Sequence, residues 1–440
     1  MENHARERVA IADPLHVPPK ARLYVVSLRL IGVFAVTAAA ILQWAWLYWV
    51  GLLVWLNMYL TYWFWRSLFD KRLTDLFELR EEDTPDESES GLPFVTVIVP
   101  ARNEENKIET ALRSVAAQDY PAFEAIAIND HSTDSTGAIL KRLAAELPVV
   151  RVLNDPELPE GWQGKANAVW QAACMANPKS EWLLLTDADV VYHPKALTSA
   201  VRHAADNEID FLTIVPYIDN GSLMEELLLT LKWSMFLMLA PKDMSKPRAR
   251  PVGVGPFMLV RKAAYFESGG HSILLGREPE DTYLAAVVKQ WGGTLAVGWT
   301  RGMLRWRQYD GFAQMRKHWI RKTRTCFNNS ALHSLSELAL NLLCLVLPLP
   351  CAAAAILTQY AAGDFLMGAT LYAVVAAAFY VSVVRSQARA RIISRIRRGA
   401  PWLAPLTGLV LAWISATTLF QILTRAPMDW RGRGMTHVDK

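Results

Sequence analysis

Cysteine is scarce in this chain, which has 4 among 440 residues. No two of them have the spacing of a zinc site or of a disulfide framework, so the sequence excludes the disulfide-stapled secreted class. We expect the cysteines to be small buried hydrophobic residues in a reducing compartment. They are Cys174, Cys326, Cys344 and Cys351.

Charge is also limited. Charged residues make up 20 % of the chain, and the formal net charge of +4 gives no reason to expect nucleic acid as a partner. Hydrophobic residues make up 52 %, which is too many for a plain soluble enzyme. They concentrate in about the first 70 and the last 110 residues, whereas the middle has the pattern of a soluble α/β protein.

The N-terminal part is almost continuously apolar from Leu23 to about Trp65. Because one membrane span needs about 20 residues, this stretch holds either two closely connected helices or one long helix with an interfacial lead-in. A cleaved signal peptide would have a shorter apolar core, of about 7–15 residues. We therefore predict a polar N-terminus over 1–22, a transmembrane anchor over 23–69 and an acidic linker over 70–92.

The C-terminal part contains three candidate spans, Leu338–Leu357, Phe365–Val384 and Leu403–Leu423. We assign residues 331–425 to a transmembrane bundle and 426–440 to a basic tail. Arginines crowd the connection before the last span, as in cytoplasmic loops. They are Arg385, Arg389, Arg391, Arg395, Arg397 and Arg398. Three full spans would put the tail outside the cell, unless one segment is re-entrant; Pro401 and Pro405 point to the last one.

The middle part, 93–310, alternates short apolar runs with helical patterns, which predicts a mostly parallel sheet with helices on both faces. The expected strands are Phe94–Pro100, Ala122–Asn129, Val149–Leu153 and Glu181–Thr186. The expected helices are Glu104–Gln118, Ser135–Glu146, Ala166–Ala176 and Tyr283–Trp291. In such sheets ligands bind beyond the carboxyl ends of the strands.

Carboxylates follow the expected strands at these ends. Asp130 lies in the turn Asn129–Thr136, which either binds a ligand or caps the next helix. Asp187 and Asp189 come after the run that ends at Leu185, and alternate residues of an extended chain point the same way, so the two can hold one hard cation. A D-x-D triplet also occurs by chance.

A further pair, Glu280–Asp281, precedes the helical run Tyr283–Trp291. Acidic residues stabilise a helix N-terminus, and a carboxylate there also suits a general base that takes a proton from an attacking hydroxyl. Both interpretations stay open for this pair in isolation.

Taken together, these motifs resemble family 2 glycosyltransferases. The resemblance covers about Phe94 to Phe327 and rests on five motifs in order: VTVIVPARNE at Val95–Glu104, the NDHSTDST turn, Gly164–Lys165 followed by Ala168, Asp187–Asp189, and Glu280–Asp281. It implies a GT-A fold, which is α/β with a Rossmann-like, mostly parallel sheet, here with transmembrane α-helices at both ends. The motifs around Trp162 and His271, and the terminal Trp430–Arg433, are similar to bacterial hopanoid-associated and carotenoid-acid lipid glycosyltransferases.

The resemblance also implies roles for individual residues. Pro100, Arg102 and Glu104 would line the nucleotide pocket, and Asp130 would contact the uracil or the ribose. Lys165 would approach the diphosphate, although a solvated loop lysine is the plainer interpretation. Asp189, with Asp187, would hold Mg²⁺ or Mn²⁺, and Asp281 would be the base of an inverting displacement.

Residues 311–330 form the last segment of interest. Membrane-bound relatives carry Q/R-x-x-R-W near the membrane, and this chain has Met315 and His318 before Trp319. Met315, Trp319 and Ile320 share a helical face, which predicts a basic amphipathic helix in the membrane interface. Trp319 is then an acceptor-binding residue, together with Glu280, or simply an interfacial anchor.

The function expected from the resemblance is transfer of a sugar from a UDP-sugar to a membrane lipid, with inversion, at the cytosolic face of a bacterial inner membrane. One alternative is a processive polysaccharide synthase, which the altered Q/R-x-x-R-W motif disfavours. The other is a catalytically degenerate membrane scaffold or transport component, and the presence of Asp130, Asp187, Asp189 and Asp281 together argues against it.

Overall fold

The computed structural model describes residues 19–42, 45–81, 91–241, 243–326, 329–362, 367–426, 429–430 and 433–434. Nearly all of the predicted polar N-terminus, much of the predicted acidic linker and most of the basic tail lie outside these ranges. Half of the terminal Trp430–Arg433 motif does too.

The centre of the chain is an eight-stranded sheet with the order β1-β10-β7-β9-β5-β2-β3-β4. Its strands are β1 (Phe77–Glu78), β2 (Phe94–Ala101), β3 (Phe123–Asn129), β4 (Val150–Asn154), β5 (Ser180–Leu185), β7 (Phe211–Val215), β9 (Met258–Arg261) and β10 (Leu295–Trp299). Only β9 runs antiparallel to its neighbours within this sheet, which confirms the predicted mostly parallel α/β architecture.

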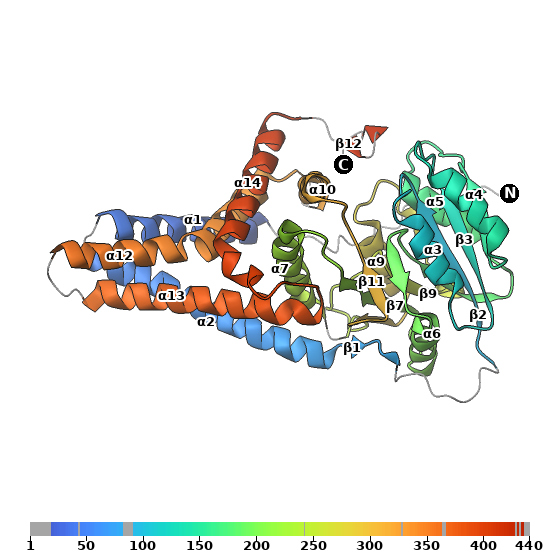
Figure 1. Cartoon of the computed structure of the whole chain (residues 1–440), viewed down its shortest axis with the longest axis horizontal. Helices are drawn as coiled ribbons and strands as arrows, with labels where there is room; N and C mark the ends of the chain where they lie inside the picture. Colours follow the sequence, from blue (N-terminus) through green and yellow to red (C-terminus); the bar gives the residue numbers. More distant parts are fainter. Residues whose placement is uncertain are drawn as a thin grey trace.

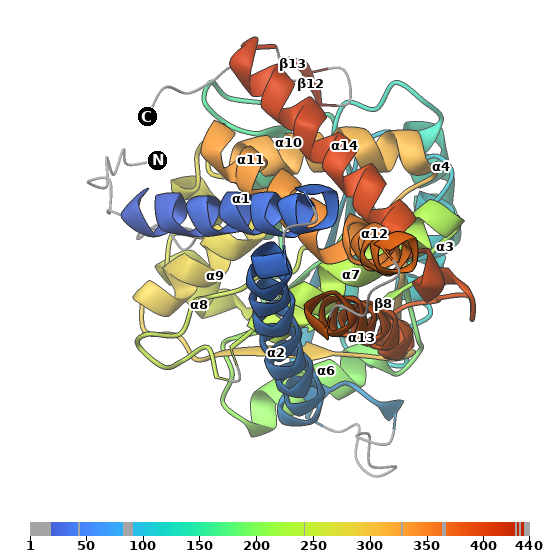
Figure 2. The ribbon, with the colours of Figure 1, turned by 90° about the vertical axis from the view of Figure 1, so that its left-hand side faces the viewer.

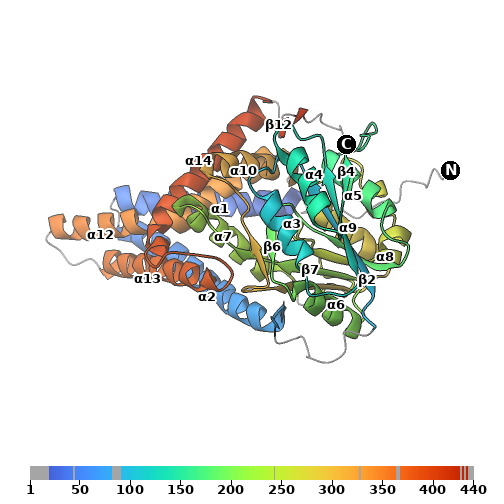
Figure 3. The same ribbon diagram turned by 45° about the vertical axis from the view of Figure 1, so that its right-hand side comes forward.

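The strand sequences explain this arrangement. In β2 the consecutive residues Val95 to Val99 are all buried, so helices or loops cover both faces of the sheet. The helices around it, drawn in Figure 3, are α3 (Ile108–Ala116), α4 (Thr136–Glu146), α5 (Gly164–Cys174), α6 (Ala196–Asp206), α8 (Lys262–Glu267) and α9 (Glu280–Gln290). Four of these match the helices expected from the sequence.

A smaller sheet with the order β6-β11-β8 lies beside the large one. It consists of β6 (Val190–Tyr192), β8 (Tyr217–Ile218) and β11 (Leu304–Trp306). Since β6 directly follows Asp189, this sheet adjoins one of the predicted ligand-binding carboxylates.

The remaining helices gather at the opposite end of the molecule (Figure 1). They are α1 (Pro19–Leu42), α2 (Ala45–Asp75), α11 (Ala331–Asn341), α12 (Pro348–Ala362), α13 (Met367–Arg389) and α14 (Ala404–Leu423). The first and last parts of the chain pack together here, because α2 contacts α13 through Trp55 and Phe379, whose ring centroids are 5.8 Å apart. Helices α12 and α13 run along the long axis, and α14 crosses them at an angle (Figure 2).

Two of the described helical stretches, Met367–Ile392 and Ala400–Leu423, are long and apolar enough to cross a membrane. A third candidate is the pair Ala331–Val346 and Pro348–Ala361, which bends by 54° at its break. In α1 and α2 the described apolar stretches are shorter, Val25–Ala38 and Tyr48–Leu60, and the N-terminal membrane anchor stays a prediction.

Proline positions explain where the break lies. The last span, which Pro401 and Pro405 had made the suspected re-entrant segment, is instead the unbroken helix α14. Pro405 does not break it, because it lies in the first turn, where a missing N–H costs no hydrogen bond. The bend falls before Pro348, after the π-helical turn η3 (Leu342–Val346).

The expectation for the cysteines was partly wrong. Cys351 is buried, but Cys344 is only half-buried and Cys174 is exposed at the end of α5. The side chain of Cys326 lies outside the described part of the chain.

Candidate active site

Three neighbouring strands are each followed by a residue whose backbone lies in the left-handed region. Asn103 follows β2, His131 follows β3 and Asp155 follows β4, with φ angles of 53°, 54° and 44°. Asparagine, aspartate and histidine are the non-glycine residues that best tolerate this backbone region, and strained backbone of this kind clusters at ligand sites. The loops at the carboxyl edge of the sheet therefore share a strained backbone conformation of the kind found at ligand sites.

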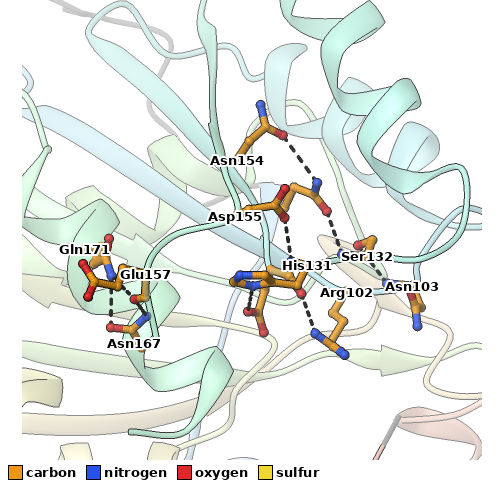
Figure 4. Close-up of polar contacts among 11 residues, drawn as sticks. Arg102, Asn103, His131, Ser132, Asn154, Asp155, Glu157, Asn167 and Gln171 are labelled. Carbon is orange, nitrogen blue, oxygen red and sulfur yellow. Dashed lines mark hydrogen bonds and ion pairs between the residues drawn. The ribbon is translucent and has the colours of Figure 1, made fainter. Parts of the chain in front are cut away.

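Arg102 and Asp130 meet at this edge. The Arg102 guanidinium donates to the Asp130 carbonyl oxygen at 2.8 Å, and Asp130 is buried. The His131 ring lies against the Asp130 carboxylate, with Nδ1 and Oδ1 3.2 Å apart, while the His131 amide donates to Asp155 (Figure 4). Pro100 is the second-last residue of strand β2, shortly before Arg102. Pro100, Arg102 and Asp130 are three of the four residues predicted to surround a nucleoside.

Polar contacts also fix the loop that leads into α5. The Glu157 carbonyl accepts hydrogen bonds from Asn167 and Gln171, both at 2.7 Å (Figure 4). The loop is thereby tied down on α5, whose second residue is Lys165. Lys165 is held in place rather than being a solvated loop lysine.

Lys165 bridges two of the predicted carboxylate sites. Its Nζ lies 2.7 Å from Asp187 and 3.1 Å from Glu280. Burial alone would lower the pKa of the Lys165 ammonium, but the two carboxylates outweigh it and raise that pKa. Burial would likewise raise the pKa of Glu280, yet Lys165 and Lys322 hold it below its usual range. Lys165 and Glu280 are thus both charged around neutral pH.

Asp281 lies at the other side of the same space. Its carboxylate accepts from the amides of Gly255, at 3.3 Å, and of Thr282, at 2.7 Å. A Cβ at Gly255 would lie 3.4 Å from Asp187 and from Lys165 and 3.7 Å from Asp281. Gly255 therefore marks the point where the three side chains converge, as expected for backbone that approaches a ligand.

The protonation of Asp281 is shifted by its surroundings. Burial raises the pKa of this carboxyl, Lys322 counteracts the shift, and Glu280 adds to it. A carboxylate whose pKa is raised is a better proton acceptor for a hydroxyl. Its position and its raised pKa are compatible with a general base.

Asp189 lies at the boundary between the two sheets. Its Oδ1 accepts from the Trp306 indole N–H at 2.9 Å. Burial raises the pKa of Asp189, and the nearby carboxylates of Asp187 and Glu104 raise it further. This crowding of negative charge suits a divalent cation.

No group of three or more His, Cys, Asp or Glu side chains among the described residues has the arrangement of a complete metal site. Asp187 and Asp189 fit a site that phosphate oxygens and water complete, which is the usual arrangement for Mg²⁺. The donor set present is therefore compatible with a metal held between protein and nucleotide.

Helix α10 (Phe312–Cys326) reaches the site from the end of the molecule that holds α1, α2 and α11 to α14. These are named the membrane-side helices, because they include the candidate membrane spans. Arg321 pairs with Glu278 at 3.4 Å, and the charge of Lys322 acts on both Glu280 and Asp281. These basic residues had been expected in the membrane interface. Arg321 thus contacts the loop that precedes α9, the helix that carries Asp281.

The apolar face of α10 also packs on protein. Met315 and Ile320 are buried, and Phe312 stacks on Trp413 of α14 at 6.2 Å. The predicted amphipathic helix is present, but α14 covers part of the face expected to meet lipid.

Trp319 faces α7 (Leu223–Leu239). The Lys232 ammonium of α7 lies 5.6 Å from the Trp319 ring and 5.5 Å from the Trp233 ring. Trp233 in turn packs edge-on against Trp306, at 5.4 Å. This aromatic row connects Trp319 to Asp189 and so to the rest of the site.

A buried histidine lies behind the Lys165 cluster. The Tyr265 hydroxyl and His271 Nδ1 are 2.8 Å apart. Burial lowers the pKa of His271 to about 4, which keeps the ring neutral. His271 belongs to the Gly269–His271 motif noted in the sequence, whereas the position of Trp306 carried no signal of its own.

The comparisons with known proteins agree with this picture. Glycosyl transferase family 2 matches residues 96–267. The 4,4'-diaponeurosporenoate glycosyltransferase of Staphylococcus aureus strain MRSA252 is 29 % identical over 185 residues, covering 40 % of this chain and 46 % of that protein. The protein of the same name from strain USA300 is 28 % identical over the same length. The chain thus spans about half the length of the curated relatives it matches.

Among solved structures, the mannosyltransferase PcManGT from Pyrobaculum calidifontis, in complex with GDP-Man and Mn²⁺, is 21 % identical, with a TM-score of 0.49. That match covers 91 % of this chain and 99 % of the other. The family match, together with these relatives, places residues 96–267 of this chain in glycosyl transferase family 2.

Proposed function

We propose that this protein transfers a sugar from a UDP-sugar to a lipid acceptor at the cytosolic face of a bacterial inner membrane, with inversion at the sugar carbon. The curated relatives act, by their names, on a carotenoid acid, so a lipid carboxyl or hydroxyl is the proposed acceptor class. The protein would be a multi-pass membrane enzyme.

One observation carries the proposal. Lys165, Asp187, Glu280 and Asp281 come from three separate segments and converge around Gly255 at the carboxyl edge of the sheet. A non-catalytic scaffold would not need Lys165, its two carboxylate partners and the Asp281 carboxyl of raised pKa around one glycine. Strongly perturbed groups that share a cleft are typical of catalytic sites.

The proposed roles are as follows for each group of residues. Pro100, Arg102, Glu104 and Asp130 would surround the nucleoside, with Lys165 beside the diphosphate. Asp187 and Asp189 would hold a Mg²⁺ or Mn²⁺ ion, which, when bound, neutralises charge on the departing nucleotide. Glu280 would bind the acceptor next to the base.

For a hydroxyl acceptor, the Asp281 carboxylate takes the hydroxyl proton as the acceptor oxygen forms its bond to the anomeric carbon. The bond from that carbon to the nucleotide oxygen breaks, and the nucleotide leaves with its electron pair. Attack opposite to the leaving group inverts the configuration. A carboxylate acceptor brings no proton, so Asp281 would then only exclude water and orient the acceptor.

On the acceptor side we place Trp319 and its aromatic row. Trp233 Nε1 is buried and has no hydrogen-bond acceptor among the described residues. An acceptor group that enters beside it could therefore accept a hydrogen bond from the indole N–H. The membrane-side helices include two that are long and apolar enough to cross a bilayer. Both observations support an acceptor that arrives from a membrane.

The test is UDP release by the protein in lipid nanodiscs. A panel of UDP- and GDP-sugars would be screened with Mn²⁺, Mg²⁺ or EDTA, and with and without extracted membrane lipid. We expect metal-dependent release from one UDP-sugar, stimulated by the lipid. Absence of both binding and release with every nucleotide sugar would overturn the proposal in favour of a degenerate membrane component.

A further inference from the structure

The connection between α13 and α14 carries an unusual charge. Residues 385–398 contain six arginines and no acidic residue. All six arginines are exposed. A single-sign patch of this density attracts anions unless the protein itself neutralises it.

Part of this connection is docked on the catalytic domain. Ser394 pairs with Ile218 of β8 in a parallel bridge, in which the Ile218 amide donates to the Ile393 carbonyl at 3.0 Å and the Arg395 amide to the Ile218 carbonyl at 2.9 Å. Ser394 is fully buried and its hydroxyl bonds Thr230 of α7 at 2.9 Å. The connection thus joins the edge of the small sheet through a single β-bridge.

Acidic residues of the catalytic domain neutralise only part of the patch. Arg395 lies 3.5 Å from Asp219, and Arg397 lies 3.0 Å from Glu226. Asp219 also serves Arg305, at 2.9 Å. The Arg395 and Arg397 side chains are still 70 % and 66 % exposed, so even the paired arginines remain accessible to an anion.

Apolar side chains border the patch. Trp402 is 57 % exposed, and Leu403 and Leu406 are 39 % and 37 % exposed. The connection joins two helical stretches that are long and apolar enough to cross a membrane. Arginine beside exposed tryptophan and leucine suits a lipid headgroup layer, whereas a nucleic acid would leave the apolar side chains in water.

We propose that residues 385–406 bind the headgroups of anionic phospholipids, and that this binding supports catalysis by seating the small sheet. This inference rests on the membrane location in the proposed function. The path is short: Ile218 pairs with Ser394 on one side and with Trp306 on the other, and Trp306 bonds Asp189 at 2.9 Å. A lipid that fixes the connection also fixes the edge that positions Asp189.

The direct test is lipid binding. Thermal unfolding of the detergent-solubilised full chain would be followed while phosphatidylglycerol, phosphatidylcholine, glycerol phosphate or inorganic phosphate is added. The test variant is Arg385→Gln/Arg398→Gln, which leaves the ion-paired Arg395 and Arg397 intact. The matched control is Lys141→Gln/Lys179→Gln, which removes two exposed charges from the catalytic domain.

We expect phosphatidylglycerol, but not phosphatidylcholine, to stabilise the wild type. Each arginine near an anionic surface contributes about a fivefold effect, so the double variant should need about 30-fold more phosphatidylglycerol, and the control no more than the wild type. Equal stabilisation by free phosphate would show an anion site rather than a lipid surface. Equal responses of the two double variants would overturn the proposal.

The coupling to catalysis is tested in nanodiscs of phosphatidylcholine with and without phosphatidylglycerol. We expect UDP release to rise severalfold with phosphatidylglycerol in the wild type and to stay at the phosphatidylcholine level in the Arg385→Gln/Arg398→Gln variant. Release that is equal in both lipids contradicts the coupling alone. Release in neither lipid contradicts the proposed function, and the binding experiment remains informative in that case.

Discussion

The proposed donor side and the proposed acceptor side of the site are built from different kinds of structure. The donor side consists of strand ends and the first turn of α5, which succeed one another between Pro100 and Asp189. The acceptor side consists of β11, α7 and α10, with Trp306, Lys232 and Trp319, which reach the site from later in the chain. The donor side therefore depends on the sheet, whereas the acceptor side depends on how the membrane-side helices are seated.

The comparison predicts different outcomes for variants on each side. Loss of a donor-side group should abolish binding or chemistry for every substrate. Loss of an acceptor-side group should reduce transfer to the acceptor and leave donor hydrolysis largely intact.

The largest effect is expected where the two sides meet, at Asp281. Asp281→Asn removes the proposed base, so transfer to a hydroxyl acceptor should fall on the order of 1,000-fold, while donor affinity stays within about twofold. Steady-state UDP release and donor titration by calorimetry measure the two quantities.

Asp206→Asn, at the exposed end of α6, is the matched control and should behave as the wild type. Loss of donor binding in Asp281→Asn would mean that Asp281 has a structural role on the donor side instead.

The next effect is a pH dependence of stability on the donor side. The pKa of His271 is lowered by burial to about 4 in the folded protein, compared with about 6.5 when unfolded. The unfolded chain binds the proton more readily, so stability is full above about pH 6.5 and falls by about 3 kcal/mol as the pH drops towards 4. Unfolding in denaturant at pH 7.5 and pH 5 should show a loss of about 2 kcal/mol, because pH 5 covers only part of the range.

His271→Asn keeps an acceptor for the Tyr265 hydroxyl and removes the titrating ring. It should be less stable at pH 7.5 but lose less on acidification than the wild type. An unchanged pH slope would show that another group is responsible.

Gly255→Ala tests whether the donor side is as tightly enclosed as the distances indicate. The new methyl group would contact Asp187, Lys165 and the space beside Asp281. These are ordinary contact distances, so the free protein accepts the methyl group, which then takes space that the donor would occupy. Such overfilling costs about 1–3 kcal/mol, so donor affinity should fall about 100-fold at the upper end. Donor titration measures it.

Gly302→Ala adds the same methyl group where nothing lies within 4 Å. It should bind the donor normally. Normal donor binding by Gly255→Ala would mean that the sugar nucleotide lies elsewhere.

Trp306→Phe probes the hydrogen bond between the small sheet and Asp189. The phenyl ring preserves packing against Trp233, but the Asp189 carboxylate loses its indole donor. Hydrogen bonds to charged groups contribute about 1.5–3 kcal/mol, and water replaces part of this. We therefore expect the Mn²⁺ concentration for half-maximal UDP release to rise about tenfold. A Mn²⁺ titration at saturating donor checks this, and an unchanged midpoint would separate Asp189 from the metal.

The sequence was sufficient for most of the donor side. Apolar runs that end in short polar side chains located β2, β3 and β5, and Asp187, Lys165 and Asp281 do converge in the structure. The contact of Lys165 with Asp187 follows from one rule, that the carboxyl ends of parallel strands share an edge, whereas Asp281 reaches this edge from the first turn of α9. A local pattern sufficed because each of these residues lies at or near the end of its own strand or the start of its own helix.

The acceptor side could not be predicted in the same way. Trp306 lies in an ordinary strand, and only the pairing of β11 with β6 brings its indole to Asp189. Arg321 was expected to face water at a membrane surface, but Glu278 lies opposite it once α10 packs on the site. Contacts between distant segments of this kind leave no periodic signal.

The smallest effect is the most specific test of the acceptor side. Trp319→Ala removes one of the two rings that flank the Lys232 ammonium, an interaction of about 1 kcal/mol. Transfer to lipid should then fall about fivefold, while hydrolysis of the donor by water changes less than twofold. Trp291→Ala, an exposed tryptophan at the end of α9, is the control and should change neither rate. Because an anchoring residue would lower both rates together, only the ratio of transfer to hydrolysis distinguishes acceptor binding by Trp319 from simple attachment of α10.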